Sequence, residues 1–230
     1  MECLHDWVSG KTCLYKNTSC NPNTCLFKYL FERQIELSNI PKGVLFHKAL
    51  YPEICDTSVT VDLQSIQRNI TEFVKNGYNL YLWSDYFGNG KTTWSVDLLL
   101  QYIFDNIYRI GYNTTVCKFV RVPELLIDMK AFTNQDSEYF QKINTLKNCD
   151  VVVWDDLGAS NLSNYDHSTL FSLLECRLSQ GLSNIYTGNL DERGLERAIG
   201  QRLCSRIWNG SKVLEFRGRD RRNNKEAEIK

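Results

Sequence analysis

Long apolar runs, net charge and internal repeats are all missing from this sequence of 230 residues. No run approaches the ~18 apolar residues that suggest a membrane span. Residues 1–6 lack the basic and apolar regions of a signal peptide. Lysine plus arginine equals aspartate plus glutamate, at 27 each, so overall charge does not indicate a nucleic-acid partner. These absences predict a cytoplasmic protein with no membrane partner.

The composition is that of an ordinary globular protein, apart from its cysteines. Apolar residues make up 43% and charged residues 23% of the chain, whose length suffices for one sizeable α/β domain and a small appendage. Five of the nine cysteines are scattered along the chain, and most of these five are predicted to be small buried hydrophobic residues: Cys55, Cys117, Cys149, Cys176 and Cys204. The other four lie within the first 25 residues.

The N-terminal segment is rich in metal-ligand residue types. Cys3, His5, Cys13, Cys20 and Cys25 supply five candidates, whereas a structural zinc site needs four. So short a segment cannot bury its own core, and a metal could supply its folding free energy. We predict Zn²⁺ bound by four of these five residues. The absence of a Cys-x-x-Cys pair leaves an iron–sulfur cluster, or free cysteines packed against the rest of the protein, as alternatives.

Two domains and a linker are predicted along the chain. Residues 1–37 form the Cys-rich module, 38–59 the linker, which begins with a break containing Pro41 and Gly43, and 60–230 the main domain. Strands are expected at 79–84, 115–120, 151–154, 183–187 and 212–216. Helical spacing is found at 26–37, 91–109 and 168–180. Strands alternating with helices predict a parallel sheet covered on both faces.

A glycine-rich loop follows the first predicted strand directly and precedes a helix. It consists of Gly88, Asn89, Gly90, Lys91, Thr92 and Thr93. Glycines let backbone N–H groups converge on phosphate oxygens, and the helix N-terminus adds positive potential. Lys91 is predicted to reach the β- and γ-phosphates of ATP, and Thr92 to ligate Mg²⁺. Asp85 stands where the full pattern has glycine, and the alternative is a turn with a chance lysine.

An acidic pair ends the third predicted strand. Asp155 and Asp156 follow an apolar run and are expected at the carboxyl edge of the sheet, where open α/β sheets bind ligands. Asp155 is predicted to bind Mg²⁺, directly or through water, and Asp156 to polarise the attacking water. The alternative is a helix-capping pair.

Two later elements complete the candidate site. Asn189 follows the fourth strand and could orient the water or contact the γ-phosphate, or it could be an ordinary turn residue. Arg202 and Arg206 are four residues apart and lie on one helix face. An arginine presented to a neighbouring subunit's phosphate stabilises transition-state charge, whereas the alternative is a solvated basic face.

Together, the Gly-Asn-Gly-Lys-Thr loop, the Asp-Asp-Leu-Gly strand end, the Thr-Gly-Asn after strand four and the Arg-x-x-x-Arg helix resemble helicase loaders of the DnaC/DnaI type. The related IstB-like transposition ATPases share much of this pattern. The resemblance covers about residues 60–220 and implies a protein of a bacterial or phage-infected bacterial cell. It implies an α/β P-loop AAA+ core with a five-stranded parallel sheet in the order 5-1-4-3-2.

The resemblance also implies partners and an activity. They are a hexameric replicative DNA helicase, single-stranded DNA, ATP with Mg²⁺, and self-association that places Arg206, and with it Arg202, across a subunit boundary. The N-terminal module would dock on the helicase. The last predicted strand ends near Phe216 and leaves fourteen residues, too few for a helical lid, so a lidless ATPase with slow hydrolysis is expected.

Three rival functions fit parts of the same pattern. A transposition regulator would use the same ATPase on duplex DNA. A small-molecule kinase would need an acceptor pocket and lid arginines. A non-catalytic adaptor would bind nucleotide without hydrolysing it, which Asp85 and Asp156 make reasonable because both depart from the usual residue types.

Overall fold

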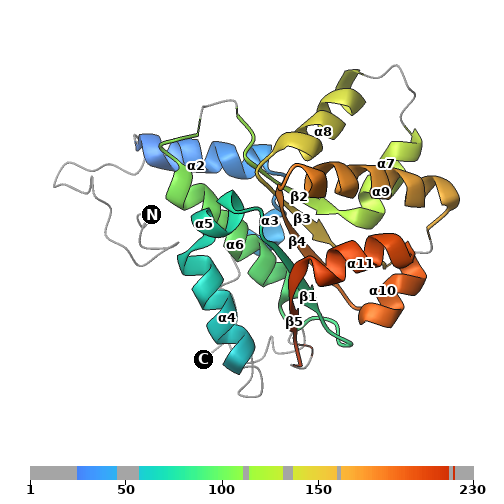
Figure 1. The fold of residues 1–230 in the computed structure, drawn as a ribbon. Coiled ribbons are helices and arrows are strands. Elements are labelled where there is room, and N and C mark those ends of the chain that lie inside the picture. The colour runs from blue at the N-terminus through green and yellow to red at the C-terminus, as the bar shows by residue number, and fades with distance from the viewer. Residues whose placement is uncertain are drawn as a thin grey trace.

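Five parallel strands form the central sheet in the computed structural model, which describes residues 25–45, 57–110, 114–131, 137–159, 162–217 and 220 (Figure 1). The strands are β1 (Asn79–Trp83), β2 (Cys117–Arg121), β3 (Val151–Asp155), β4 (Ser183–Gly188) and β5 (Ser211–Glu215). Their spatial order is β2-β3-β4-β1-β5, with every neighbouring pair parallel. The predicted order 5-1-4-3-2 is therefore confirmed, and each predicted strand overlaps an observed one.

The strands divide their side chains between two hydrophobic cores. Leu80 and Leu82 of β1 face one core, and Tyr81 between them faces the other. The same alternation separates Val153 from Val152 and Trp154 in β3. Every residue of β3 is buried, as expected of a parallel strand inside a sheet covered on both faces.

Helices cover both faces of the sheet (Figure 1). On one side lie α2 (Leu26–Leu37), α3 (Lys42–Leu45), α4 (Thr57–Arg68), α5 (Ile70–Lys75) and α6 (Lys91–Asn106). On the other lie α7 (Val122–Ala131), α8 (Ser137–Asn148), α9 (Asn164–Ser179), α10 (Glu192–Ile199) and α11 (Gln201–Asn209). This three-layer arrangement leaves the carboxyl edge of the sheet open to the loops that form the candidate site.

Helix α2 packs into the main domain. Phe27 and Phe31 are buried, and the Phe27 ring meets Phe104 of α6 edge-on at 5.1 Å between centroids. Just after α2, the Ser38 carbonyl accepts a hydrogen bond of 2.8 Å from the Phe119 N–H on the edge strand β2. The part of the predicted Cys-rich module that the structure describes therefore shares its core with the sheet domain. Residues 1–24, and 46–56 of the predicted linker, lie outside the described residues.

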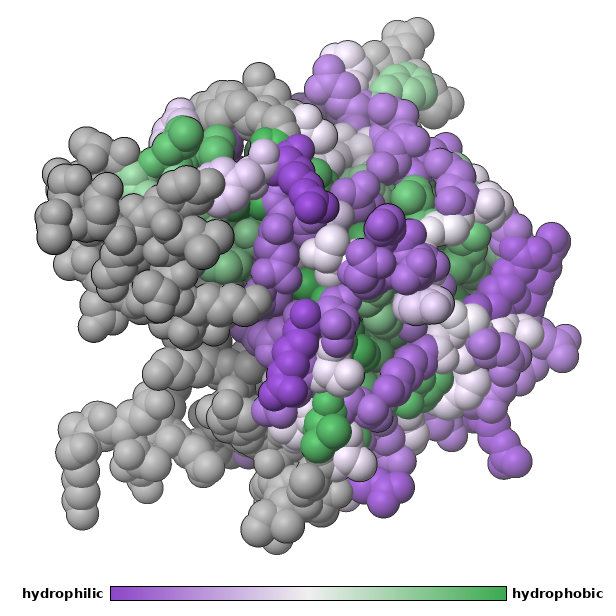
Figure 2. All heavy atoms as spheres, turned by 60° about the vertical axis from the view of Figure 1, so that its left-hand side comes forward, coloured by the Kyte–Doolittle hydropathy of each residue, from purple (hydrophilic) through white to green (hydrophobic). Residues whose placement is uncertain are grey.

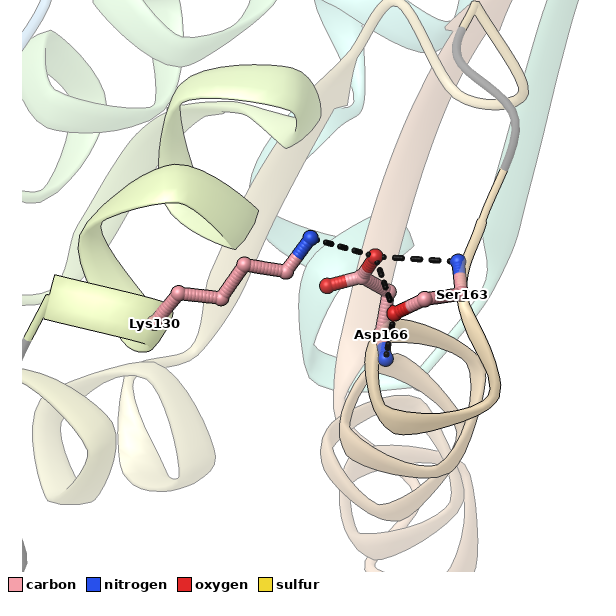
Figure 3. A network of polar contacts seen from close by, with 3 residues as sticks. All are labelled: Lys130, Ser163 and Asp166. Atoms are coloured by element: carbon pink, nitrogen blue, oxygen red, sulfur yellow. Dashed lines mark hydrogen bonds and ion pairs between the residues drawn. The ribbon is translucent and has the colours of Figure 1, made fainter.

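A polar network fixes the start of α9 and ties it to α7 (Figure 3). The Ser163 hydroxyl accepts from the Asp166 N–H, and the Asp166 carboxylate accepts from the Ser163 N–H at 3.0 Å, which is a capping box. Lys130 donates to the same carboxylate at 2.8 Å. Burial raises the pKa of Asp166, but the hydrogen bonds from Lys130 and Ser163 outweigh it and place the pKa below its usual value.

We expect Asp166→Ala to lower the free energy of unfolding by about 1–2 kcal/mol at neutral pH, because it removes a helix cap and the partner of Lys130. Glu72→Ala is the control, since it removes only the exposed ion pair with Lys75 and should change stability by less than about 1 kcal/mol. Urea denaturation measures both. A lowered pKa stabilises the fold above the unfolded value, so the Asp166 effect should shrink below pH ~4.

A second carboxyl group shows the opposite shift. Asp97 of α6 accepts a hydrogen bond of 2.6 Å from Gln67 of α4. Burial raises its pKa to about 6, despite the opposing effect of that hydrogen bond. A raised carboxyl pKa means that stability falls as pH rises from about 4 to about 6. We expect Asp97→Asn to abolish this dependence and to stabilise the protein by about 1–2 kcal/mol at pH 7, measured by urea denaturation across pH. An unchanged pH profile would contradict the assignment.

The face drawn in Figure 2 shows hydrophilic residues over much of the described surface, with smaller hydrophobic areas between them. None of the described helices combines the length and apolar character needed to cross a membrane.

Candidate functional site

The candidate site forms where the carboxyl ends of three neighbouring strands meet. The loop after β1 leads into α6, β3 ends in Asp155, and β4 ends next to Asn189. Because β4 lies between β1 and β3, residues distant in sequence come together at this edge. The sheet therefore brings together the glycine-rich loop and the acidic pair, as the sequence predicts.

The loop between β1 and α6 adopts backbone angles that favour glycine at two positions. Gly88 has φ 69° and Gly90, which caps the start of α6, has φ 100°. A side chain at Gly88 would also overlap the carboxylate of Asp220. Both glycines are thus required for the turn that starts α6 at Lys91. Asp85, which replaces the first glycine of the full pattern, is exposed to solvent.

The ammonium group of Lys91 lies inside this loop. Only 7% of the residue is exposed, and its Nζ donates to the Tyr86 carbonyl at 2.9 Å and to the Asn89 side-chain oxygen at 3.2 Å. Asn89 is fixed in turn by a 2.6 Å hydrogen bond from its Nδ2 to Ser84 Oγ. The loop thus holds a cation at the N-terminal end of a sixteen-residue helix, where anions are favoured.

Asp155 connects the loop to the sheet. Its Oδ1 accepts hydrogen bonds from Thr92 Oγ1 at 2.8 Å and from Thr187 Oγ1 at 2.7 Å. Burial raises the pKa of Asp155, although the two hydroxyl hydrogen bonds lower it, and the neighbouring Asp156 raises it further. Carboxylate and hydroxyl oxygens are hard ligands that suit Mg²⁺, so the Thr92–Asp155 pair fits that ion.

Asp156 differs from Asp155 in backbone and exposure. It has φ 58°, in the left-handed region, and its side chain is exposed. Its N–H donates to Thr187 Oγ1 at 3.1 Å, and the Leu157 N–H donates to the Thr187 carbonyl at 2.8 Å. These bonds to β4 fix the turn, so the Asp156 carboxylate is presented at the sheet edge. Non-glycine residues in this conformation are uncommon and are found disproportionately at functional sites.

Asn189 lies one residue beyond β4 and is half-buried. Its side-chain oxygen is buried and, in the described part of the chain, has no hydrogen-bond partner. A buried amide oxygen without a partner is unusual in a folded protein, and such groups often belong to ligand sites. This is compatible with the predicted contact with water or phosphate.

The two arginines of α11 face α9 of the same chain. The Arg202 guanidinium lies 5.0 Å from the centroid of the Phe171 ring, and Arg206 forms an ion pair with Glu175. The side chain of Arg206 is 39% exposed. Within the described residues, neither arginine contacts Lys91, Thr92 or Asp155. Their predicted action on a neighbouring subunit therefore stays a prediction.

Sequence reasoning missed two residues of this site. Thr187 bridges Asp155 and the turn at Asp156, and its place in the Thr-Gly-Asn motif was the available signal. Arg121 ends β2, is paired in register with Asp155, and donates to Glu124 at 3.0 Å. The Glu124 hydrogen bond raises the pKa of Arg121, and Asp155 and Asp156 add to the rise, so its charge lies close to the acidic pair.

Of the predicted zinc ligands, Cys25 alone lies within the described residues. It is half-buried, packs against the core on the α6 side and forms no disulfide. Cys3, His5, Cys13 and Cys20 lie outside those residues. No group of three or more histidine, cysteine, aspartate or glutamate side chains suited to a metal occurs within the described ranges.

Comparison with known proteins gives consistent relatives. Residues 32–225 match the model of the IstB-like ATP binding protein family. The replicative helicase loader DnaI of Bacillus subtilis (strain 168) is 26% identical over 223 residues, covering 86% of this chain and 68% of the loader. The crystal structure of the DnaC helicase loader is similar with a TM-score of 0.64 and 20% identity, over 76% of this chain and 99% of that one. The crystal structure of DnaI has a TM-score of 0.62 and 23% identity, over 83% and 100%.

Proposed function

This chain belongs to the IstB-like ATP-binding protein family, and we propose that it is an ATP-dependent loader that docks on a hexameric replicative DNA helicase and helps place it on single-stranded DNA. ATP binding and slow hydrolysis to ADP and phosphate act as the switch. The observation that carries the proposal is the junction of Lys91, Thr92, Asp155 and Thr187 at one sheet edge, in a chain similar to the helicase loaders DnaI and DnaC.

Binding of the triphosphate follows from the loop. Glycines 88 and 90 leave room for close approach of phosphate to the backbone, and Lys91 exchanges its carbonyl partners for phosphate oxygens. Thr93 lies in the first turn of α6 beside them. Thr92 and Asp155 would hold Mg²⁺. When bound, that ion neutralises charge on the phosphate oxygens.

The two remaining residues at the carboxyl edge of the sheet, Asp156 and Asn189, act in hydrolysis. The exposed carboxylate of Asp156 accepts a hydrogen bond from the attacking water and polarises it, while Asn189 orients that water through its partnerless amide oxygen. Aspartate is one methylene shorter than glutamate, so the water must lie closer. The shorter side chain supports slow turnover of the isolated chain, which assembly would accelerate.

The partners are inferred from the relatives. DnaI of Bacillus subtilis is named a replicative helicase loader, and the solved DnaC is a helicase loader. We propose that residues 1–37 dock on the helicase, with Zn²⁺ as their structural ion. Self-association through the ATPase domain would bring Arg206 of one subunit to the nucleotide of the next.

One alternative function is suggested by the family, whose model is that of the IstB-like proteins. A transposition-regulating ATPase would share the nucleotide site and differ in its DNA. Preference for duplex over single-stranded DNA, measured by fluorescence anisotropy in the presence of ATP, would favour that alternative.

The loader function is tested by co-purification with the replicative helicase of the host, using the full chain and ATP. We expect a stable complex that deposits the helicase on a circular single-stranded DNA lacking free ends. The absence of any complex with the helicase would overturn the proposed function while leaving the nucleotide site intact.

The two aspartates are expected to separate binding from turnover. Asp155→Asn should weaken Mg²⁺-dependent ATP binding by about tenfold, because it removes a carboxylate suited to the ion. Asp156→Asn should leave binding nearly unchanged and slow hydrolysis by about 100-fold, the usual contribution of a positioned base. Calorimetry and phosphate release measure the two effects. Hydrolysis by Asp156→Asn at the wild-type rate would exclude Asp156 as the water-polarising residue.

A further inference from the structure

A cavity of about 350 Å³ lies beside the edge strand β2, separate from the phosphate loop. Its walls come from the turn after α2, from β2, and from α7 and α8. Its volume is within the range of small-ligand sites. Its lining includes Asn39, Lys118, Phe119, Asp128, Lys142 and Leu146.

We propose that this cavity binds a small organic anion whose carboxylate or phosphate group lies between Lys118 and Lys142, with its apolar part against Phe119 and Leu146. A free metabolite and the acidic side chain of a partner protein share this chemistry.

The charges that line the cavity do not balance. Glu124 is paired with Arg121 at 3.0 Å, and Asp128 is paired with Lys142 at 2.6 Å. Lys118 is half-buried, and no carboxylate in the described ranges lies within ion-pair distance of it. The cavity therefore has one positive charge in excess. A cation removed from water in this way is stabilised by a bound anion.

The electrostatics of Lys118 agree with this. Burial lowers the pKa of its ammonium and outweighs the opposing effects of Cys149 and Cys117, and the nearby positive charge of Lys142 makes a smaller contribution in the same direction as burial. Lys118 and Lys142 thus lie close enough to repel one another. An anion between two such groups relieves both the repulsion and the loss of hydration.

The wall opposite α7 and α8 is a defined turn. Asn39 has φ 56°, a conformation that few residues other than glycine and asparagine adopt. The preceding carbonyl, from Ser38, bonds to the Phe119 N–H of the strand edge, and Pro41 follows in the lining. The turn therefore covers part of the open edge of β2, and the cavity occupies the space beyond it.

The cavity also has apolar lining residues, and these determine which chemistry suits the part of the ligand that carries no charge. Phe119, Val120, Leu125 and Leu146 are buried hydrophobic side chains that reach the cavity. They pack within the two cores, and inorganic phosphate alone would not use the apolar surface that they present to the cavity. A ligand with one anionic group and a compact apolar or planar part matches both halves of the lining.

The test measures anion binding with the phosphate loop disabled. In the Lys91→Ala background, phenyl phosphate is titrated into protein carrying ¹³C at lysine Cε, and the Lys118 signal is identified by its loss in Lys118→Met. We expect saturable binding that raises the apparent pKa of Lys118. Calorimetry, which does not need the Lys118 signal, compares the variants: Lys118→Met and, independently, Lys142→Met should each weaken binding at least about tenfold. Lys75→Met, at an exposed position of α5, is the control and should not change it.

A second titration, with a short peptide of leucine and glutamate, distinguishes the two sources. Binding of phenyl phosphate indicates a free small anion, and binding of the peptide alone indicates an acidic side chain of a partner. Equal binding by all variants, or no binding of either probe, overturns the proposal. Because Lys91 is absent throughout, neither result depends on the proposed ATPase function.

Discussion

Replacing Lys91 by alanine is expected to lower the affinity for ATP by about 100-fold or more. Lys91 is 7% exposed as a residue, and its ammonium group is held by the Tyr86 carbonyl and the Asn89 side chain at the start of α6, where the phosphates are expected. Charge-assisted hydrogen bonds to phosphate contribute about 1.5–3 kcal/mol each, and a loss of about 3 kcal/mol corresponds to roughly 100-fold in affinity.

Isothermal titration calorimetry with ATP and Mg²⁺ measures this effect. Lys75→Ala is the matched control, because Lys75 is 73% exposed on α5 and pairs only with Glu72 among the residues described. Circular dichroism should show an unchanged fold for both variants. Equal ATP affinity of Lys91→Ala and wild type would mean that the loop is an ordinary strand-to-helix turn.

Much of the candidate nucleotide site could be predicted because its signals are local. The glycine-rich loop must join a strand to a helix, and Gly88, Gly90 and Lys91 specify that turn within four residues. The apolar run that becomes β3 is an equally local signal, and it ends at Asp155. Short apolar runs bounded by turn residues also identified all five strands, although their ends moved by up to two residues.

Contacts that depend on side-chain packing between distant segments could not be predicted. Arg177 illustrates this, since nothing in its helix distinguishes it from a surface arginine. It is fully buried and donates to the carbonyls of Leu146, Cys149 and Ser183 and to the Asn184 side chain. Likewise, Thr187 joins the site only because β4 lies between β1 and β3, which brings its hydroxyl to Asp155.

Helix α2 shows that the sequence pattern also could not predict which domain a helix packs against. Its amphipathic pattern predicted a helix over 26–37, and the helix was confirmed. The pattern does not say which core the apolar face joins. Phe27 and Phe31 both pack against the ring of Phe104, more than seventy residues away in α6.

Arg206 has a contact within its own chain that competes with its proposed action on a neighbouring subunit. Within the chain it pairs with Glu175 of α9, and both side chains are partly exposed. Partly exposed ion pairs contribute about 0–1 kcal/mol, so this pair can open when a stronger anion is available. A neighbouring subunit's γ-phosphate is such an anion, and a guanidinium fork matches its oxygens.

We therefore expect Arg206→Ala to leave folding and ATP affinity of the monomer nearly intact, and to lower assembly-stimulated ATP hydrolysis by about 10³-fold, as loss of an arginine finger does in other nucleotide hydrolases. Phosphate release with helicase and single-stranded DNA measures it.

Glu175→Gln is the matched control, since it removes the same ion pair but keeps the guanidinium, and stimulated hydrolysis should persist. Mixing Arg206→Ala with Lys91→Ala chains should restore part of the activity, because some interfaces then combine an intact Lys91 with a neighbour's intact Arg206. Equal losses in Arg206→Ala and Glu175→Gln, or no recovery in the mixture, would leave Arg206 as a residue that acts only through its contact with α9.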